Sequence, residues 1–291
     1  MGYLHIQNLY KDQTILMFKE CYALEKIHGT STHISWNYIN KTINFFSGGE
    51  SHEKFVKLFD VEHLKTKFEE LFLDSNVIIY GEAYGGKQQG MSKTYGNELK
   101  FIAFDVLVDY MWLSVPNAEN VANNFNLEFV DYVKTSTKLE DLDAERDKES
   151  TQAVRNGCGH GKAREGVVLR PLVEFKTNNG RRVICKHKGA AFDETKTHRE
   201  VSQEEMKVMV EAKEIAEEYV TEMRLNHVLD KLPQDINIES MKLVIDAMVE
   251  DVYREAEGEI VKSKEVTKQI SIKTAIMFKK RLQRNLVNNN A

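Results

Sequence analysis

The chain has 291 residues, enough for one large and one smaller domain, and its 42% hydrophobic and 29% charged residues are typical of soluble globular proteins. No apolar run approaches the roughly 18 to 20 residues that a membrane span requires, and the N-terminus has no signal-peptide pattern. We therefore expect a cytoplasmic protein without a membrane partner. Three widely spaced cysteines argue against a disulfide framework and indicate a reducing compartment.

Residues 1–199 have the mixed pattern of an α+β domain. We predict a helix over 52–73, where apolar residues recur at helical spacing, and a surface excursion over the charged and Gly-rich residues 138–164. Short apolar runs with the length and composition of β-strands cover residues 77–80, 101–104, 166–169 and 182–185. Each run adjoins a polar cluster, so the candidate site residues are expected on or beside rigid strands.

Residues 200–291 have the pattern of a small all-α domain, and the composition changes near residue 200. The segment 202–205, Ser-Gln-Glu-Glu, fits a capping box at the start of a helix that Pro233 ends. A second helix is predicted over 238–257 and a third over 264–286.

The most informative segment of the chain places Lys26 shortly before a glycine turn at Gly29. An unprotonated lysine amine can attack the α-phosphate of a nucleotide and hold it covalently, and lysine becomes unprotonated readily when buried or placed beside other cations. A lysine before a turn is common by chance, so the later clusters carry the argument. They follow in the order Gly81-Glu82-Ala83, Phe104-Asp105, Glu165 to Arg170, and Lys186-His187-Lys188.

Carboxylates and an aromatic ring among these clusters suit a bound nucleotide. Glu82 and Glu165 stand at strand ends, and triphosphate chemistry needs acidic ligands for Mg²⁺ and an acceptor for ribose hydroxyls. Phe104 offers a flat face for a purine. The alternatives are that the two acids are solvated residues at strand ends and that Phe104 belongs to the core.

Lys186 and Lys188 alternate on a predicted strand, so their side chains project to the same face. Two ammonium groups on one face repel each other unless an anion lies between them, and an α-phosphate in its transition state is such an anion. Exposed lysines on an edge strand are the alternative.

The succession of these clusters resembles that of the covalent nucleotidyltransferases, the superfamily of ATP-dependent ligases and mRNA capping enzymes. The run from Glu25 to Thr30, Glu-Lys-Ile-His-Gly-Thr, is most similar to the bacteriophage RNA ligase 2 family, which includes the kinetoplast RNA editing ligases. The resemblance covers residues 20–190. It implies a nucleotidyltransferase (ATP-grasp-like ligase) domain with antiparallel sheets, and ATP with Mg²⁺ or Mn²⁺ as cofactors.

The resemblance also implies roles for individual residues. Lys26 would take AMP from ATP, while Lys186 and Lys188 would act at the α-phosphate. Glu165 would organise the metal, with Asp105 as a second candidate metal ligand. The implied ATP-binding residues are Glu25, Lys26, Ile27, Gly29, Glu82, Phe104, Glu165, Lys186 and Lys188.

Two positions depart from the family pattern. Ser47 stands where the family commonly has an arginine, and Ser31 stands where related phage enzymes often have an asparagine. Both changes concern the expected contacts to the 5′-phosphate end rather than adenylylation of the lysine. Arg170 is a candidate to replace the arginine.

The activity implied is that of an ATP-dependent RNA ligase. Lys26 takes AMP, the AMP passes to a 5′-phosphate, and a 3′-OH then displaces it, so that nicks or bridged ends in RNA are sealed during repair. A DNA ligase is the nearest alternative, but such enzymes and capping enzymes usually append an OB-fold, whereas residues 200–291 have a helical pattern. Capping enzymes also have Asp at the position of His28. A non-catalytic RNA-binding relative is a third alternative, which the presence of all the site lysines and glutamates disfavours.

The distribution of charge bears on the nucleic-acid partner. The net charge of −5 argues against one, but residues 258–291 contain eight Lys and Arg and only two Glu. We expect a monomer that binds nicked duplex or bridged RNA, with RNA or DNA as the template. The candidate contacts to the phosphate backbone are Lys268, Lys273, Lys279, Lys280, Arg281 and Arg284. A solvated helix surface is the alternative.

Overall fold

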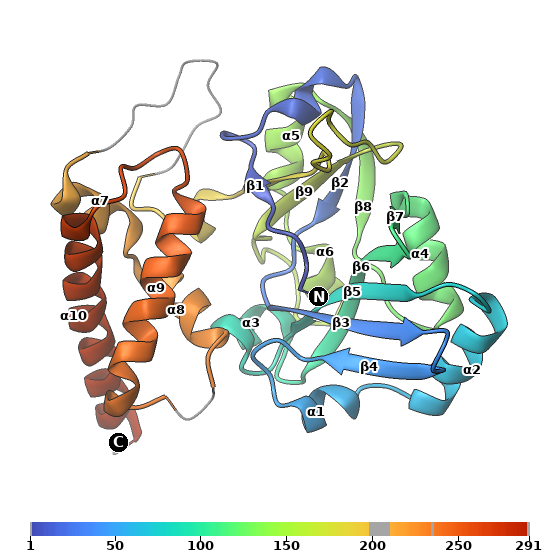
Figure 1. Ribbon diagram of the computed structural model, residues 1–291, viewed down its shortest axis with the longest axis horizontal. Helices are drawn as coiled ribbons and strands as arrows, with labels where there is room; N and C mark the ends of the chain where they lie inside the picture. Colours follow the sequence, from blue (N-terminus) through green and yellow to red (C-terminus); the bar gives the residue numbers. More distant parts are fainter. Residues whose placement is uncertain (1, 198–209, 234–235, 290–291) are drawn as a thin grey trace. The chain divides into compact units, whose positions relative to one another are not determined.

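The computed structural model describes residues 2–197, 210–233 and 236–289, and it divides into two compact units (Figure 1). Unit 1 is Met1–Gly189 and unit 2 is Ala190–Ala291. The division falls ten residues before the predicted boundary at 199/200. The reason is local: the backbone oxygen of Glu194 accepts hydrogen bonds from Thr221 and Arg224, and Lys196 N–H donates to Glu218, all within unit 2.

Unit 1 contains two five-stranded sheets, which confirms the predicted α+β class with antiparallel sheets. In the first sheet only the edge pair is parallel, and the strand order is β1 (Gln7–Asn8), β10 (Cys185–Lys188), β9 (Gly166–Pro171), β2 (Glu20–Glu25) and β8 (Tyr132–Ser136). The second sheet is antiparallel throughout, in the order β4 (Thr42–Phe46), β3 (Thr30–Asn37), β5 (Val77–Tyr84), β6 (Lys100–Val108) and β7 (Met111–Trp112).

The predicted strands fall on these sheets with one shift. The runs 77–80, 101–104 and 166–169 lie within β5, β6 and β9. The run 182–185 meets β10 only at Cys185, because the backbone of residues 182–183 pairs with residues 175–176 instead.

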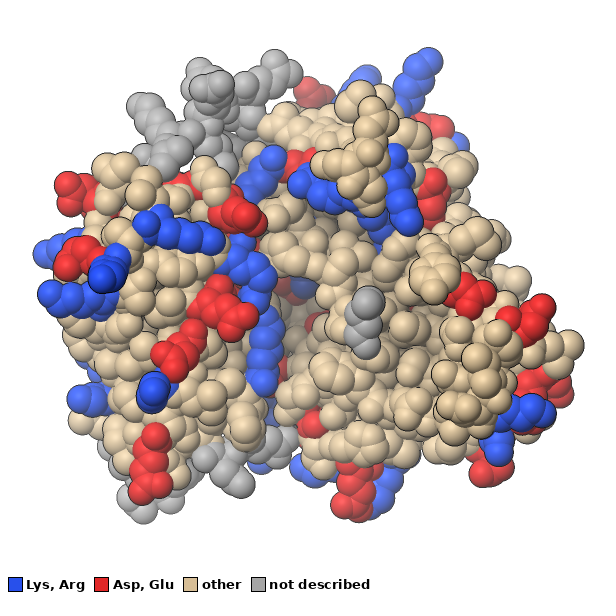
Figure 2. Space-filling view, viewed as in Figure 1, with Lys and Arg blue, Asp and Glu red and all other residues tan. Residues whose placement is uncertain are grey.

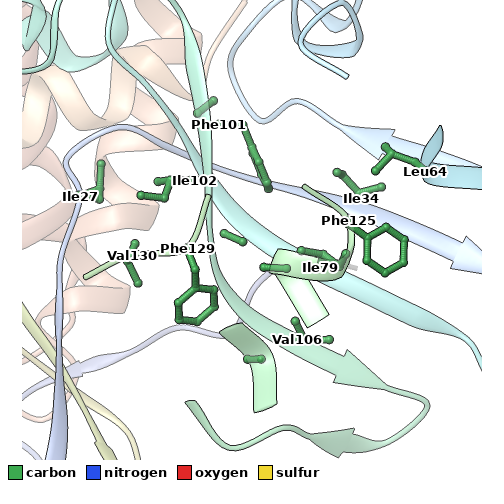
Figure 3. Packing of buried hydrophobic residues seen from close by; sticks show 14 of the residues in the cluster. Ile27, Ile34, Leu64, Ile79, Phe101, Ile102, Val106, Phe125, Phe129 and Val130 are labelled. Atoms are coloured by element: carbon green, nitrogen blue, oxygen red, sulfur yellow. The ribbon is translucent and has the colours of Figure 1, made fainter. Parts of the chain in front are cut away.

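The core of unit 1 lies where β3, β5 and β6 meet the inward sides of α2 (Val61–Leu71) and α4 (Val115–Asn124). Figure 3 shows how the side chains from these elements and from the adjoining loops interdigitate; it labels Ile27, Ile34, Leu64, Ile79, Phe101, Ile102, Val106, Phe125, Phe129 and Val130. Burial of such large apolar side chains stabilises each by about 1.5–3 kcal/mol relative to exposure. The chain crosses from the first sheet to the second between β2 and β3, at residues 26–29, so the candidate nucleophile lies on this crossover.

The remaining helices of unit 1 are short. These helices are η1 (Thr14–Met17), α1 (His52–Val56), η2 (Gln88–Gly90), α3 (Ser92–Tyr95), α5 (Leu139–Arg146) and α6 (Thr151–Arg155). Two of the predictions for this part of the chain are wrong. The helix predicted over 52–73 is two helices, because the carboxylate of Asp60 caps the N-terminus of α2 by accepting from His63 N–H. The excursion predicted over 138–164 contains α5 and α6, and it buries Leu142, Gln152 and Ala153.

The described elements of unit 2 are all helical, as predicted, and they pack around their own apolar core. They are η3 (Ala190–Phe192), α7 (Ala212–Tyr219), α8 (Glu222–Asp230), η4 (Ile238–Ser240), α9 (Met241–Glu255) and α10 (Lys264–Asn289). The predicted capping box at 202–205 lies outside the described residues. The helix predicted to run to Pro233 is interrupted at Thr221, whose hydroxyl caps α8 by accepting from Arg224 N–H. No helix among the described residues is long and apolar enough to cross a membrane.

Candidate active site

Lys26 follows the last residue of β2, where the backbone is fixed and the side chain is accessible. Its N–H donates to the carbonyl of Gly166 at 3.0 Å, which holds the crossover against β9. Its Nζ lies 2.9 Å from Oε2 of Glu165, and its side chain keeps 23% of its surface exposed. The amine is therefore held in one place by a buried carboxylate while remaining reachable by a ligand.

Glu165 gathers the basic groups of the site around one carboxylate. Its side chain is only 1% exposed, and besides Lys26 it contacts Nδ1 of His28 at 3.1 Å and Nζ of Lys188 at 3.1 Å. Burial raises the pKa of this carboxyl, but Lys26, Lys188 and His28 together hold its pKa well below the ordinary value. The structure thus brings together Lys26, Glu165 and Lys188, which stand in three separate clusters of the sequence. The contacts of Glu165 keep its carboxylate ionised at neutral pH.

His28 belongs to this group although no role was predicted for it. Its ring contacts the oxygen of Glu165 that also contacts Lys26. The backbone N–H of His28 donates to the hydroxyl of Tyr95 at 3.4 Å. The only sequence feature that could have indicated a role for His28 was its position, two residues after Lys26 and directly before Gly29. An alternation of side chains along the crossover places Lys26 and His28 on the same side, with Ile27 between them turned into the core.

Two glycines are required because backbones approach each other closely at the site. A side chain on Gly29 would overlap the carbonyl of Ala83 on β5, and the Gly29 N–H donates to Oε1 of Glu82 at 3.2 Å. Gly166 has φ +147°, and a side chain there would overlap the carbonyl of His187 on β10. The second approach sets how closely Glu165 lies beside Lys188.

The other predicted phosphate and ribose contacts lie on strands beside the crossover. Glu82 is half-buried on β5, where its partner across the ladder is Ser31. Lys186 is buried on β10, two residues before Lys188 and therefore on the same face of the strand. These positions agree with one nucleotide site that both sheets contribute to.

Glu25 and Ile27, which were predicted to bind ATP, turn their side chains inward. The carboxylate of Glu25 accepts from Oγ of Ser150 at 2.5 Å and from the N–H of Gln152 at 3.2 Å. Burial raises the pKa of Glu25, and the Ser150 hydrogen bond partly offsets it. Ile27 is part of the core. The side chain of Glu25 therefore anchors the end of β2 to α6, and neither side chain is available to a nucleotide.

Asp105 has a different role from the predicted metal ligand. Its fully buried carboxylate lies 3.0 Å from Nη1 of Arg170 and 2.5 Å from Nη1 of Arg182, and it accepts from the hydroxyl of Tyr3 at 2.6 Å. A carboxylate that already holds two guanidinium groups has little negative charge left for a dication. Arg170 also pairs with Glu174, so it is not free to replace the family's arginine at a 5′-phosphate.

Phe104 is the extra residue of a β-bulge, since Tyr80 pairs with Asp105 and Gly81 with Ala103. Its ring is partly buried and meets the ring of Tyr3 edge to face, with centroids 4.9 Å apart. Stacking of adenine on Phe104 stays a prediction.

The segment around Ser47 shows what stands in place of the expected arginine. The hydroxyl of Ser47 donates to the carbonyl of Glu50 at 2.8 Å and closes a turn. The carboxylate of Glu50 accepts from the amide of Gln88 at 2.6 Å, and the Gln88 carbonyl accepts from the hydroxyl of Thr30 at 2.7 Å. An acid and an amide therefore line the start of β3 where a cation was expected.

The basic residues of α10 are largely engaged within unit 2. Lys273 lies 2.9 Å from Glu217, Arg281 donates to Asn226, and Arg284 lies 3.5 Å from Glu222. Lys268 lies 3.7 Å from Glu265. Lys279 and Lys280 are exposed and form no ion pair within the described ranges. Exposed ion pairs such as those of Lys268 and Arg284 are weak, so nucleic-acid binding by α10 stays a prediction.

The residues at the site fit a metal ion that is bound partly by the phosphates of a nucleotide better than a metal ion that is bound by protein side chains alone. Within the described ranges, no three His, Cys, Asp or Glu side chains are grouped to hold a metal ion. Mg²⁺ keeps several waters and is usually bound through one or two carboxylates together with substrate phosphates. Glu165 is the predicted metal ligand that remains at the site.

Among curated proteins none matches this chain. Solved structures of Naegleria gruberi RNA ligase are similar over 66% of this chain and 57% of theirs: the complex with PPi at TM-score 0.49 and 16% identity, a mutant with ATP and Mn at 0.47 and 16%, and a mutant with AMP and Mn at 0.49 and 15%. This chain thus spans little more than half the length of those proteins. A family model for RNA ligases matches residues 19–188, more than half of the chain and the part that contains Lys26, Glu165 and Lys188. The chain belongs to the RNA ligase family.

Proposed function

We propose that the protein is an ATP-dependent RNA ligase that forms lysyl–AMP at Lys26. The observation that carries this proposal is the arrangement around Glu165, whose two carboxylate oxygens hold Lys26 on one side and Lys188 on the other. The three side chains come from three separate segments, and they converge beside the crossover between the sheets. A surface lysine before a turn would not require a buried carboxylate or a second buried lysine.

The first step is the transfer of AMP to the amine. The unprotonated Nζ of Lys26 attacks the α-phosphorus of ATP, the N–P bond forms as the bond to pyrophosphate breaks, and the second proton of the amine is lost to solvent. Lys188, with Lys186 on the same strand face, faces the charge that develops on the α-phosphate. A bound Mg²⁺ or Mn²⁺ would shield the charge on the pyrophosphate as it leaves.

The second and third steps join RNA ends. The 5′-phosphate of one strand displaces Lys26 from AMP, and a 3′-OH then displaces AMP to form the new phosphodiester bond. We propose nicked duplex RNA, or RNA ends bridged by a template, as the substrate in RNA repair. We propose that Glu82 contacts a ribose hydroxyl, which is supported by its hydrogen bond from the Gly29 N–H at the turn beside Lys26.

The test is transfer of label from ATP to the intact protein. With α-labelled ATP and Mg²⁺ the protein should become labelled, and labelled GTP should not substitute. Lys26→Ala should remove the label, whereas Lys65→Ala, a change of an exposed lysine on α2, should not. Sealing of nicked RNA duplexes is then compared with sealing of nicked DNA duplexes. Faster sealing of DNA would identify a DNA ligase, and absence of labelling by any nucleotide would remove the proposed chemistry altogether.

A further inference from the structure

A group of exposed apolar side chains lies at the end of β2 opposite to Lys26. Met17 is 85% exposed, Val173 77% and Phe175 52%. Phe18 joins them, because its ring meets that of Phe175 edge to face with centroids 5.8 Å apart. Single exposed apolar residues are common on protein surfaces, but here two aromatic rings contact each other at an end of the sheet that also exposes Met17 and Val173.

A hairpin presents half of this group. Residues 173–183 fold back on themselves, with the Thr177 N–H donating to the carbonyl of Arg181 at 2.8 Å and the Val183 N–H donating to that of Phe175 at 2.9 Å. Phe175 is itself one of the paired residues, since its carbonyl accepts from Val183. The aromatic group is therefore fixed by backbone pairing.

Lysines stand directly beside the aromatic rings. Lys19 follows Phe18 and Lys176 follows Phe175; both are exposed, and neither forms an ion pair within the part of the chain that the structure describes. The nearby acids are engaged, since Glu20 lies 2.9 Å from Lys134 and Asp12 pairs with Arg181. We call Met17, Phe18, Lys19, Val173, Phe175 and Lys176 the aromatic–basic face. Figure 2 shows several Lys and Arg side chains around this end of unit 1.

Resting on the function proposed above, we propose that the aromatic–basic face binds the RNA strand about 20 Å from the end that is joined. Aromatic rings next to unpaired lysines suit single-stranded nucleic acid, since bases stack on rings of any sequence and lysines neutralise phosphates. An apolar protein partner would leave both lysines unused.

The distance to the nucleophile follows from β2, which joins the face to the active site. The six residues of β2, Glu20–Glu25, extend for about 20 Å. A single strand that reaches from the active site to the face must span this distance, so only RNAs of sufficient length contact both places. Lys19 precedes β2 and Lys26 follows it, which places the two ends of this interval on one rigid element.

The experiment measures binding of the full-length protein to labelled single-stranded RNAs of about 4 and about 12 nucleotides, chosen to fall short of and to exceed this interval. Phe175→Ala should weaken binding of the longer RNA about tenfold and leave that of the shorter RNA unchanged. The double variant Lys19→Ala, Lys176→Ala should lower the slope of log affinity against log salt by about 1.4, or about 0.7 for each phosphate contact.

Matched controls exist elsewhere on unit 1. Tyr110 is an aromatic residue that is 89% exposed between β6 and β7, and Lys54 and Lys65 are exposed lysines on α1 and α2. Tyr110→Ala and the double variant Lys54→Ala, Lys65→Ala should bind both RNAs as the unaltered protein does. Unchanged affinity of Phe175→Ala for the longer RNA, or an equal loss for both lengths, would overturn the inference.

Labelling from ATP separates this inference from the proposed function. All of these variants should form lysyl–AMP at the normal rate, because none alters a group near Lys26. If the unaltered protein is not labelled, the proposed function fails, while the length dependence of binding still decides the present inference. Normal labelling together with unchanged RNA binding in the face variants would refute the inference alone.

Discussion

Glu165→Gln removes one negative charge and almost no volume, so it isolates the contribution of charge to the site. The carboxylate is buried and faces Lys26, His28 and Lys188 at 2.9 to 3.1 Å. Removing one partner of a buried ion pair typically costs about 3–5 kcal/mol of the free energy of unfolding, because the remaining charge is left uncompensated. In a unit of this size about 3 kcal/mol lowers Tm by roughly 10 °C. We also expect adenylylation to slow about a hundredfold, since a preorganised charge near the reacting phosphate is lost.

The assay is single-turnover transfer of label from ATP, measured well below the Tm of the variant so that all of the protein is folded. Glu70→Gln is the matched control, because Glu70 pairs with Lys67 at 2.7 Å on the exposed surface of α2 and such pairs contribute little. The control should keep both Tm and rate. A folded Glu165→Gln protein that is labelled at the normal rate would refute the assignment of this carboxylate to the site, whatever its Tm.

Three further predictions follow from the same structure. Gly166→Ala should slow label transfer at least tenfold, because the added methyl group overlaps β10 and displaces Glu165 from Lys188; normal kinetics in this variant would contradict the packing described. Residues 1–189 alone should still form lysyl–AMP, since every contact of Lys26 lies in unit 1, and an unlabelled but folded fragment would show that unit 2 takes part in the first step. Burial lowers the pKa of His33 to about 4, so between about pH 6.5 and 4 the unfolded chain binds a proton that the native chain does not. Stability should therefore fall over that range as pH falls, and urea unfolding of His33→Gln should show a shallower fall; equal slopes would exclude His33 as the cause.

The parts of the site that could be predicted are those carried by short linear patterns. Lys26, Glu165 and Lys188 each stand in a compact cluster next to an apolar strand, and the order of the clusters resembles a known family. The strand pattern also placed β5, β6 and β9, because their apolar runs are long enough to separate from loops. The sequence therefore identified the elements that support the site and the residues at its centre.

The parts that could not be predicted depend on contacts between residues far apart in the chain. Glu25 meets Ser150 across 125 positions, and Asp105 meets Arg182 across 77 positions, so no local pattern shows that both acids are already paired. The region 138–164 was expected to be a surface excursion, but Ser150 and Gln152 within it are buried and bind Glu25 at the end of β2. His28 was overlooked for a related reason: its partner Glu165 is 137 positions away, and only the fold brings their side chains within 3.1 Å.

The ion pair of Lys26 with Glu165 bears on how the first step begins. A lysine amine that is held by an ionised carboxylate keeps its proton, and a protonated amine has no lone pair with which to attack phosphorus. We therefore expect the nucleotide to change the pair before it reacts. A divalent metal ion bound with the triphosphate would compete with Lys26 for the carboxylate of Glu165, the predicted metal ligand at the site. Under the proposed function, this competition would free Lys26 from its carboxylate partner when the nucleotide is bound. If the proposed function holds, Glu165 would hold Lys26 before the nucleotide binds and the metal ion afterwards.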